Sequence, residues 1–386
     1  MKKYDIIVKG GTVVDPSQGL HEVRDVGIGD GRIAALEKDL PTDEAETVVD
    51  ASGNIVTPGL VDLHVHVYWG VAHLGIEPDP NCVAKGATTV FDAGSSGAQT
   101  FPGFKKYVID VSATRIKAFL HVSMQGQLSN VVGELLDLQW ADVNRAIKMC
   151  EDNKADIVGV KIRLGNNLVG EHGLECLKRA RAVADATGLP LMVHPGGPMT
   201  TSDMLNEMKS GDIMTHCYHR GPSGILGEDG KIRPEFRKAV QRGVLMDVGH
   251  GAGSFSFEVA KAGLAQDFPP GTISSDLHFY NIHGPVYDLA TTASKFLLLG
   301  MPFDEVIAKV TTVPAKTMGM EDEIGTLKVG LAGTPAPTGD VAVFDLQEGD
   351  FEFTDVLKVT LIGHQKLVPV ATVKGKNIYT TSSLAY

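Results

Sequence analysis

The sequence predicts an α/β protein in which a TIM-type (β/α)8 barrel carries a small β-sandwich domain formed from both chain ends. Two observations predict this fold. From residue 58 to about 331, β-branched runs that end in polar or glycine residues alternate with helix-like stretches. Before that region, and again near the C-terminus, short β-rich runs are separated by turn residues. We therefore expect residues 1–56 together with 332–386 to form the small domain, and residues 57–331 to form the barrel.

The central region contains eight candidate strands, the number that a TIM-type barrel requires. Helix-like stretches separate several of them, including residues 140–150 and 174–187. The second stretch runs into Gly188 and Pro190, as expected where a helix stops and a strand follows. The candidate strands are residues 60–67, 88–93, 116–122, 157–164, 189–194, 213–216, 244–248 and 272–276.

The terminal regions have a different texture. Residues 5–8 and 12–14 are β-rich and are followed by the turn signals Gly10-Gly11 and Asp15-Pro16. Residues 340–346 and 368–372 return to β character. Between the barrel and this last region, residues 331–339 are rich in Gly, Pro, Thr and Ala, which predicts a flexible connector.

Composition limits the classes of partner. A net charge of −12 argues against a sequence-independent hold on nucleic acid, which needs a clustered basic surface. The four cysteines form no CxxC pair, so neither a disulfide framework nor a structural zinc knot is indicated. The first apolar run, residues 6–8, is too short for a signal peptide or a membrane span. We expect a cytoplasmic protein with a small-molecule substrate; whether it forms a homo-oligomer stays open.

The string Asp62-Leu63-His64-Val65-His66 ends the first candidate barrel strand. Side chains alternate along a strand, so His64 and His66 point to the same face and can hold one metal ion together. In this fold the C-terminal ends of the strands carry the active site. Chance is the alternative explanation for a single His-x-His pair.

Three further strands end in a possible metal ligand, His194, His216 or Asp276, which makes coincidence a poor explanation. Neutral imidazoles with a carboxylate suit Zn²⁺, Fe²⁺ or Mn²⁺, and the lack of a cysteine cage indicates an open, catalytic site. Lys161 lies near the end of the fourth strand, where an unpaired cation facing the barrel interior would be costly. This lysine therefore needs a partner or a modification.

These residues resemble the amidohydrolase superfamily. The resemblance rests on Val-Thr-Pro-Gly-Leu-Val-Asp-Leu-His-Val-His at residues 56–66, followed in order by Lys161, His194, His216 and Asp276. Residues 4–11 and 325–330 also resemble the flanking β-domain of the superfamily and its junction. The chain is most similar to the dihydroorotase, D-aminoacylase and deacetylase branch. One departure is the insertion at residues 331–339, where we expect a local loop change.

The resemblance implies two divalent metal ions, with zinc favoured and iron or manganese as alternatives. It also implies that CO₂ carboxylates Lys161 and that a hydroxide between the two metals attacks an acyl carbon. Asp276 would be both a ligand and the catalytic general acid and base. The implied ligands are His64, His66 and Asp276 for the more buried metal, His194 and His216 for the more exposed one, and Lys161 as the bridge.

The same resemblance narrows the reaction. Deaminases of the superfamily commonly use a glutamate soon after the fifth-strand histidine, whereas here residues 195–199 contain no carboxylate. We therefore expect a deacetylase or deacylase that hydrolyses an N-acyl amino acid or an O-acyl hydroxy acid. Cyclic amide hydrolysis, as in dihydroorotases and hydantoinases, is the alternative. A non-catalytic scaffold of the same fold is disfavoured because no ligand is missing.

Four residues are candidate substrate contacts. Arg163 lies two residues after Lys161, so both side chains face the same side of the strand, and Arg163 could bind a substrate carboxylate. A salt bridge to a loop acid is an equal alternative. Tyr68 and Trp69 could form aromatic walls or simply pack under a loop, and His250 could hydrogen-bond the substrate. We expect the other loop histidines to lie outside the ligand set, namely His73, His219, His278 and His283, of which His278 shares the parity of Asp276.

Overall fold

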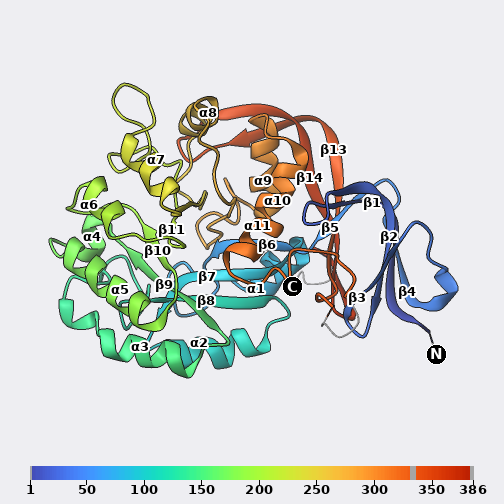
Figure 1. Ribbon diagram of the computed structural model, residues 1–386, viewed down its shortest axis with the longest axis horizontal. Coiled ribbons are helices and arrows are strands. Elements are labelled where there is room, and N and C mark those ends of the chain that lie inside the picture. The colour runs from blue at the N-terminus through green and yellow to red at the C-terminus, as the bar shows by residue number, and fades with distance from the viewer. Residues whose placement is uncertain (1, 331–335, 383–386) are drawn as a thin grey trace.

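Two sheets organise the chain in a computed structural model that describes residues 2–330 and 336–382 (Figure 1). One sheet has seven strands, all parallel to their neighbours, and the other is a mixed sheet of eight strands. The parallel sheet curls into the barrel, and the mixed sheet packs beside it. The predicted fold class, a TIM-like barrel with a small β-domain from both chain ends, is confirmed.

The barrel strands follow one another in chain order around the sheet. Every residue of β7 is buried, as expected for a parallel strand that is covered on both faces. This burial explains why the sequence shows continuous apolar runs in place of a polar and apolar alternation. The strands are β6 (Leu60–Val65), β7 (Ala87–Gly97), β8 (Arg115–His121), β9 (Ile157–Arg163), β10 (Leu191–His194), β11 (Ile213–Met214) and β12 (Leu245–Met246).

The eighth position of the barrel is filled by residues 272–277, which form no regular strand. Single parallel bridges join Thr272 to Asp247 and Leu277 to Val65, so the segment closes the ring between β12 and β6. Asp276 has φ of 47°, a left-handed value that interrupts an extended backbone. The prediction of a regular strand over residues 272–276 is therefore wrong, although its place in the barrel is right.

Helices cover the outside of the barrel (Figure 1). The long helix α5 buries Cys176, Ala180 and Ala184 at helical spacing and ends at Gly188, whose φ of 69° terminates it. The helices are α1 (Pro78–Asn81), α2 (Phe101–Tyr107), α3 (Val143–Asp152), α4 (Asn166–Val169), α5 (Gly173–Thr187), α6 (Thr201–Asn206), α7 (Pro234–Gln241), α8 (Phe257–Ala265), α9 (Leu289–Leu298), α10 (Phe303–Lys309) and α11 (Thr312–Thr317). Within the described residues, no helix is both long and apolar enough to cross a bilayer.

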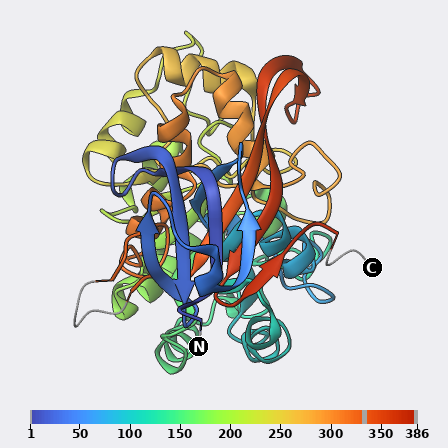
Figure 2. The same cartoon turned by 90° about the vertical axis from the view of Figure 1, so that its right-hand side faces the viewer.

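Both chain ends contribute to the mixed sheet, and Figure 2 shows N-terminal and C-terminal strands side by side. Strand β13 pairs with β5 antiparallel, which places Val341 opposite Pro58. The division of the chain into domains at residues 56 and 332 stays a prediction. Of the predicted connector, residues 331–335 lie outside the described residues. The strands are β1 (Tyr4–Asp15), β2 (Leu20–Gly29), β3 (Arg32–Glu37), β4 (Ala45–Asp50), β5 (Ile55–Pro58), β13 (Asp340–Thr354), β14 (Thr360–Lys374) and β15 (Asn377–Tyr379).

The hairpin of β13 and β14 reaches beyond this sheet and lies against the barrel beside α9 (Figure 1). Leu367 donates its backbone N–H to Ser294 Oγ at 2.9 Å. At the far end of the hairpin, Asp355 Oδ2 accepts a hydrogen bond from the backbone N–H of Phe257, the first residue of α8, at 3.0 Å. The C-terminal hairpin therefore braces two helices of the barrel.

Candidate metal centre

A cavity of about 280 Å³ opens at the C-terminal ends of the barrel strands. All six residues predicted as ligands line it, together with eight further residues. Their roles as ligands remain a prediction, but the structure brings all of them together. The lining consists of His64, His66, Leu74, Asn130, Lys161, Arg163, His194, His216, Ala252, Gly253, Ser254, Asp276, His278 and Tyr280.

Three of these residues already form a group that could hold a metal ion. The ligand atoms of His64, His66 and Asp276 lie within 4.8 Å of one another, and all three residues are buried. Asp276 Oδ1 lies 3.4 Å from His64 Nε2 and 3.2 Å from His66 Nε2. The rings of His194 and His216 stand next to this group, with their centroids 4.3 Å apart. The period of two along β6 explains why both of its histidines face the cavity.

Hydrogen bonds at Nδ1 orient three of the four histidines, which leaves Nε2 to face the cavity. Such bonds fix the ring position and the tautomer of a ligating histidine. The partners are Thr215 Oγ1 for His64 at 2.8 Å, Ser95 Oγ for His66 at 3.0 Å and Gly249 O for His216 at 2.7 Å.

Asp247 supports this arrangement from below the cavity. Its carboxylate accepts hydrogen bonds from the hydroxyls of Thr215, Thr272 and Ser274 at 2.7–2.8 Å. Because Thr215 also contacts His64, the chain of bonds runs from Asp247 to the metal group. Sequence reasoning missed Asp247, although an acidic residue inside the apolar run 244–248 was a signal.

Burial keeps the histidines neutral. It lowers the pKa of His64, His66 and His194 well below the ordinary value, and the charge of Lys161 lowers each of them further. Burial also lowers the pKa of His216 to about 3, against the opposing effect of Asp276. Neutral imidazole is the form that binds a metal ion, so these rings are ready to coordinate at neutral pH.

Among the described residues, Lys161 Nζ and Asp276 Oδ1 of the cavity have no hydrogen-bond partner. Lys161 is fully buried, and this burial lowers its pKa to about 7. Unsatisfied buried polar atoms are rare in proteins and call for a reason. Asp276 is also held in a left-handed backbone conformation, where Asn281 Nδ2 donates to its carbonyl at 2.8 Å. Strain of this kind clusters at functional sites.

Arg163 lines the cavity and is held from behind. Its Nη1 lies 3.0 Å from Gln127 Oε1 and 3.1 Å from Glu134 Oε1. Glu134 is buried and lies 2.9 Å from His121 Nε2. Burial raises the pKa of Glu134, but the charges of Arg163 and His121 outweigh this effect and lower it below the ordinary value. The ion pair to a loop acid is thus present, and the guanidinium still reaches the cavity.

The other three candidate substrate contacts lie outside the lining. The hydroxyl of Tyr68 donates to Thr100 O, and its ring packs on Phe104, so Tyr68 belongs to the core under the first loop. Trp69 points outward and is 57% exposed. His250 is buried and lies 2.7 Å from Lys295 Nζ.

In contrast, His278 and Tyr280 do line the cavity. Burial lowers the pKa of His278 to about 4, so its ring is neutral at neutral pH. The parity that His278 shares with Asp276 was the available signal for its position, whereas Tyr280 had none. The ring centroids of His278 and His66 are 6.3 Å apart, and those of His278 and Tyr280 are 5.9 Å apart.

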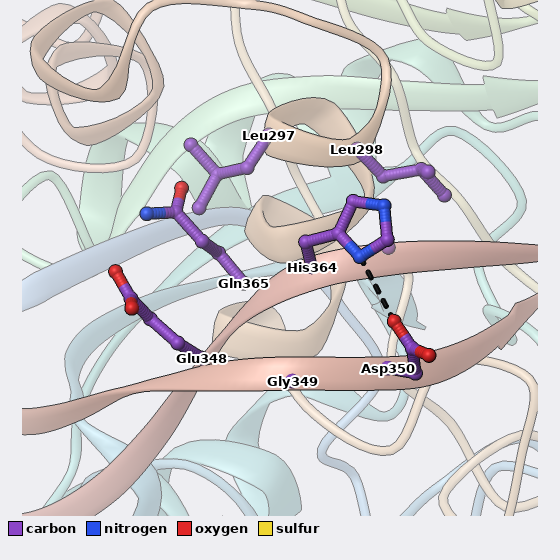
Figure 3. Close-up of a pocket in the computed structure, with 8 residues that line it drawn as sticks. Leu297, Leu298, Glu348, Gly349, Asp350, His364 and Gln365 are labelled. Carbon is purple, nitrogen blue, oxygen red and sulfur yellow. Dashed lines mark hydrogen bonds and ion pairs between the residues drawn. The ribbon is translucent and has the colours of Figure 1, made fainter.

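A second cavity, of about 480 Å³, lies between α9 and the hairpin of β13 and β14 (Figure 3). Leu297 and Leu298 form its apolar wall, and an exposed pair between His364 Nδ1 and Asp350 Oδ1, 3.0 Å apart, lies at its rim. It contains none of the residues predicted from the sequence as site residues. The chemistry of the chain is therefore concentrated in the smaller cavity at the mouth of the barrel.

The chain is similar to known proteins over most of its length. The model of the amidohydrolase family matches residues 55–333. A deacetylase of Agrobacterium fabrum, Deacetylase Atu3266, is 38% identical over 329 residues, which is 85% of this chain and 79% of that protein. A crystal structure of an adenine deaminase has a TM-score of 0.89 at 31% identity, covering 98% of this chain and 100% of that one. A crystal structure of a dihydroorotase has a TM-score of 0.88 at 34% identity, covering 97% and 98%. The chain therefore belongs to the amidohydrolase family and is a hydrolase that acts on amide-type bonds.

Proposed function

We propose that this enzyme is a metal-dependent deacylase that removes an acyl group, with acetyl favoured, from an N-acyl amino acid or an O-acyl hydroxy acid. The observation that carries the proposal is the convergence of six potential ligands on one buried cavity in which Asp276 is the sole carboxylate among the described lining residues. Relatives named as deacetylases support the acyl substrate. The four cysteines are free and buried, which fits the reducing cytoplasm that we propose as its location.

The residues of the cavity fit two divalent metal ions, with zinc favoured. Imidazole and carboxylate donors suit such ions, and Asp276 Oδ1 has no hydrogen-bond partner among the described residues. We assign His64, His66 and Asp276 to one ion, and His194 and His216 to the other.

After reaction with CO₂, Lys161 would be a further metal ligand. With a pKa of about 7, much of this lysine is the neutral amine, which is the form that attacks CO₂. The new N–C bond forms as the nitrogen loses a proton, and the product is a carbamate anion. A buried cation without a partner thereby becomes an anionic ligand.

The chemistry then divides between the metals and the side chains. When bound, the metal ions lower the pKa of water and polarise the acyl carbonyl. Asp276 Oδ1 faces the cavity and is free to accept a proton from the attacking water and to donate it to the leaving amine or alcohol. Arg163, fixed by Gln127 and Glu134, binds the substrate carboxylate through the part of its guanidinium that reaches the cavity.

Deamination is disfavoured by the same lining. A departing ammonia needs its own proton donor, and residues 195–199 supply no carboxylate. Cyclic amide hydrolysis is a second candidate, because the dihydroorotase structure matches nearly the whole chain at 34% identity. This reaction would use the same metal ligands. It would differ only in that the leaving amine stays attached to the product, because the cleaved bond is part of a ring.

A substrate panel tests the proposal. The protein, loaded with Zn²⁺ in the presence of bicarbonate, is assayed with N-acetyl amino acids, O-acetyl hydroxy acids, dihydroorotate, hydantoins and adenine. We expect turnover of an acetyl compound that bears a carboxylate. Exclusive turnover of the cyclic amides would establish the second candidate instead, and turnover of adenine would refute both.

Asp276→Asn tests the role of the acid. We expect kcat to fall by roughly 10²–10⁴-fold, the usual contribution of general acid and base catalysis. Asp43→Asn is the matched control, since Asp43 is exposed and its side chain has no partner among the described residues. Full activity in Asp276→Asn would contradict the proposed role.

A further inference from the structure

The loop that follows β12 contacts two of the proposed ligands through its backbone. Gly249 O accepts a hydrogen bond from His216 Nδ1 at 2.7 Å. Gly251 lies against Asp276 so closely that a Cβ atom on it would come within 2.4 Å of Oδ2. The next residues, Ala252 to Ser254, line the cavity. The position of this loop therefore sets the space around the catalytic acid.

His250 lies in the middle of this loop and points away from the cavity, into the core. It is fully buried, and its ring stacks on Phe255 with the centroids 4.5 Å apart. Its Nδ1 is 2.9 Å from Gly251 O, and its Nε2 is 2.7 Å from Lys295 Nζ. A ring held at both nitrogens cannot rotate without breaking a hydrogen bond.

Lys295, on α9, determines which nitrogen of His250 carries the proton. Its ammonium group has three N–H donors, and three acceptors surround it: His250 Nε2, Pro285 O at 2.8 Å and Thr354 O at 2.7 Å. An ammonium cannot accept a hydrogen bond, so His250 Nε2 is the acceptor. The proton of the neutral ring is therefore on Nδ1, which donates it to Gly251 O.

The third acceptor connects this pair to the C-terminal hairpin. Thr354 is the last residue of β13, and the neighbouring Asp355 accepts from the backbone N–H of Phe257. Val356 donates its N–H to Phe255 O at 3.3 Å, beneath the His250 ring. The tip of the hairpin, the lysine and the loop histidine thus form one continuous set of contacts that ends at Gly251.

We propose that Lys295 and His250 are a positioning pair, which transmits the docking of the β13–β14 hairpin to the loop that fixes Asp276 and His216. Neither residue touches the substrate; both act through the carbonyl and the α-carbon of Gly251. The catalytic effect that we assign to this pair rests on the proposed function. The geometry of the pair can be tested by a measurement that does not need turnover.

The kinetics of Lys295→Met give the first test. Burial lowers the pKa of Lys295 to about 7. The assay is therefore run at about pH 6, where the ammonium form of Lys295 predominates in the wild type. We expect kcat to fall roughly 10- to 100-fold, as for a displacement of about 1 Å at a catalytic group, with KM changed less than about threefold. Lys309→Met is the control, since Lys309 is also largely buried and donates to a backbone carbonyl, that of Pro270. Its kcat should stay within about twofold of the wild type.

Substitutions of His250 separate positioning from simple packing. The amide of asparagine can take the place of Nδ1–H and donate to Gly251 O, whereas leucine cannot. We expect His250→Asn to recover most of the kcat that His250→Leu loses. If Lys295→Met or His250→Leu lowers the unfolding temperature but keeps the wild-type kcat, the pair is only structural and the proposal is overturned.

The tautomer of His250 provides a readout that does not depend on activity. Nitrogen-15 NMR of the histidine rings, with the His250 signal identified by its loss in His250→Asn, should show Nδ1–H in the wild type. In Lys295→Met the ring should change to Nε2–H or to a mixture. An Nε2–H ring in the wild type would overturn the proposal. If no acyl compound is hydrolysed but the Nδ1–H ring is found, the proposed function fails and the positioning pair stands.

Discussion

At the scale of single residues, the site combines histidines whose rings are hydrogen-bonded with two polar groups that lack such a bond. His64, His66 and His216 each have a hydrogen-bond partner at Nδ1, whereas Lys161 Nζ and Asp276 Oδ1 have none in the part of the chain that the structure describes. A buried cation without a partner destabilises a fold. Lys161 in this position therefore costs stability, which fits the chemical role proposed for it.

Lys161→Met should therefore stabilise the metal-free protein while it abolishes activity. In bicarbonate-free buffer we expect a gain of about 1–4 kcal/mol in the free energy of unfolding below pH 7, since the apolar stem remains and the buried charge is removed. Urea unfolding of both proteins measures this gain. Lys154→Met, at an exposed position, should change the free energy by less than about 0.5 kcal/mol.

The advantage of Lys161→Met should depend on pH with a definite sign. The pKa of Lys161 is about 7 in the folded protein, and the ordinary value is 10.5. Between these values the unfolded chain holds a proton that the folded protein has released, so the stability of the wild type rises with pH. The difference between the two proteins should shrink from pH 7 to about 10.5. A difference that is constant with pH would contradict this explanation.

The sequence was sufficient to predict the positions of those site residues that follow a local rule. His64 and His66 obey the period of a strand, and His194, His216 and Asp276 end runs that read as strands. Asp247 and Ser95 could not be assigned in this way, because their role depends on which strand lies next to which. The same is true of His250, whose ring lies next to Lys295 of α9, a lysine that also donates to Thr354 O of the hairpin.

At the scale of elements, β7 shows how a strand adapts to the site. Gly94 has φ of 87°, and a Cβ atom there would lie 2.6 Å from Lys161 Cγ. The missing side chain creates the space in which the lysine stem passes from β9 toward the cavity. Glycine is thus required here for both its backbone conformation and its size.

Gly94→Ala tests this requirement, with Gly53→Ala as a matched control. Both glycines have positive φ, but nothing lies within 4 Å of a Cβ atom on Gly53. Both variants should lose about 1–2 kcal/mol to backbone strain, and Gly94→Ala should lose a further 1–3 kcal/mol to overpacking. Only Gly94→Ala should reduce kcat, by at least about tenfold, through displacement of Lys161. Equal losses in both variants would show that the contact with Lys161 does not matter.

Seven strands of the barrel were predictable, because parallel strands buried on both faces leave continuous apolar runs. The eighth was wrongly predicted as a regular strand, because residues 272–276 have a composition similar to that of the other strands. In the structure this segment is held by single bridges at Thr272 and Leu277 and by hydrogen bonds that involve side chains. The left-handed φ of Asp276 comes from the site and not from local preference.

At the scale of the whole molecule, the proposed ligands come from five places around the ring: β6, β9, β10, the end of β11 and the closing segment. Bound metal would link all of them. Both chain ends, in turn, brace the outside of the barrel through the mixed sheet and its long hairpin. The contribution of both ends to one sheet was predictable from the return of β character, but the reach of the hairpin over α9 depends on contacts between distant residues.

Removal of metal should therefore lower the stability of the entire barrel. A ligand present at about 1,000 times its dissociation constant stabilises the folded state by about 4 kcal/mol. We expect calorimetry to show a single transition that moves to lower temperature after treatment with a chelator and recovers with Zn²⁺. His194→Ala should reduce the difference between the two states, while Asp43→Asn should preserve it. An unfolding temperature that is independent of metal would contradict the assigned centre.

The closing segment has a consequence for the order in which this enzyme is made. The segment that carries Asp276 is also the one that joins β12 to β6, so the last wall of the barrel and the proposed catalytic acid are completed together. A nascent chain that has formed only the earlier strands contains five of the six donors, but neither a closed ring nor a group to move protons. Under the proposed mechanism, hydrolytic competence therefore begins only when the barrel closes, because the closing segment carries the group that moves protons.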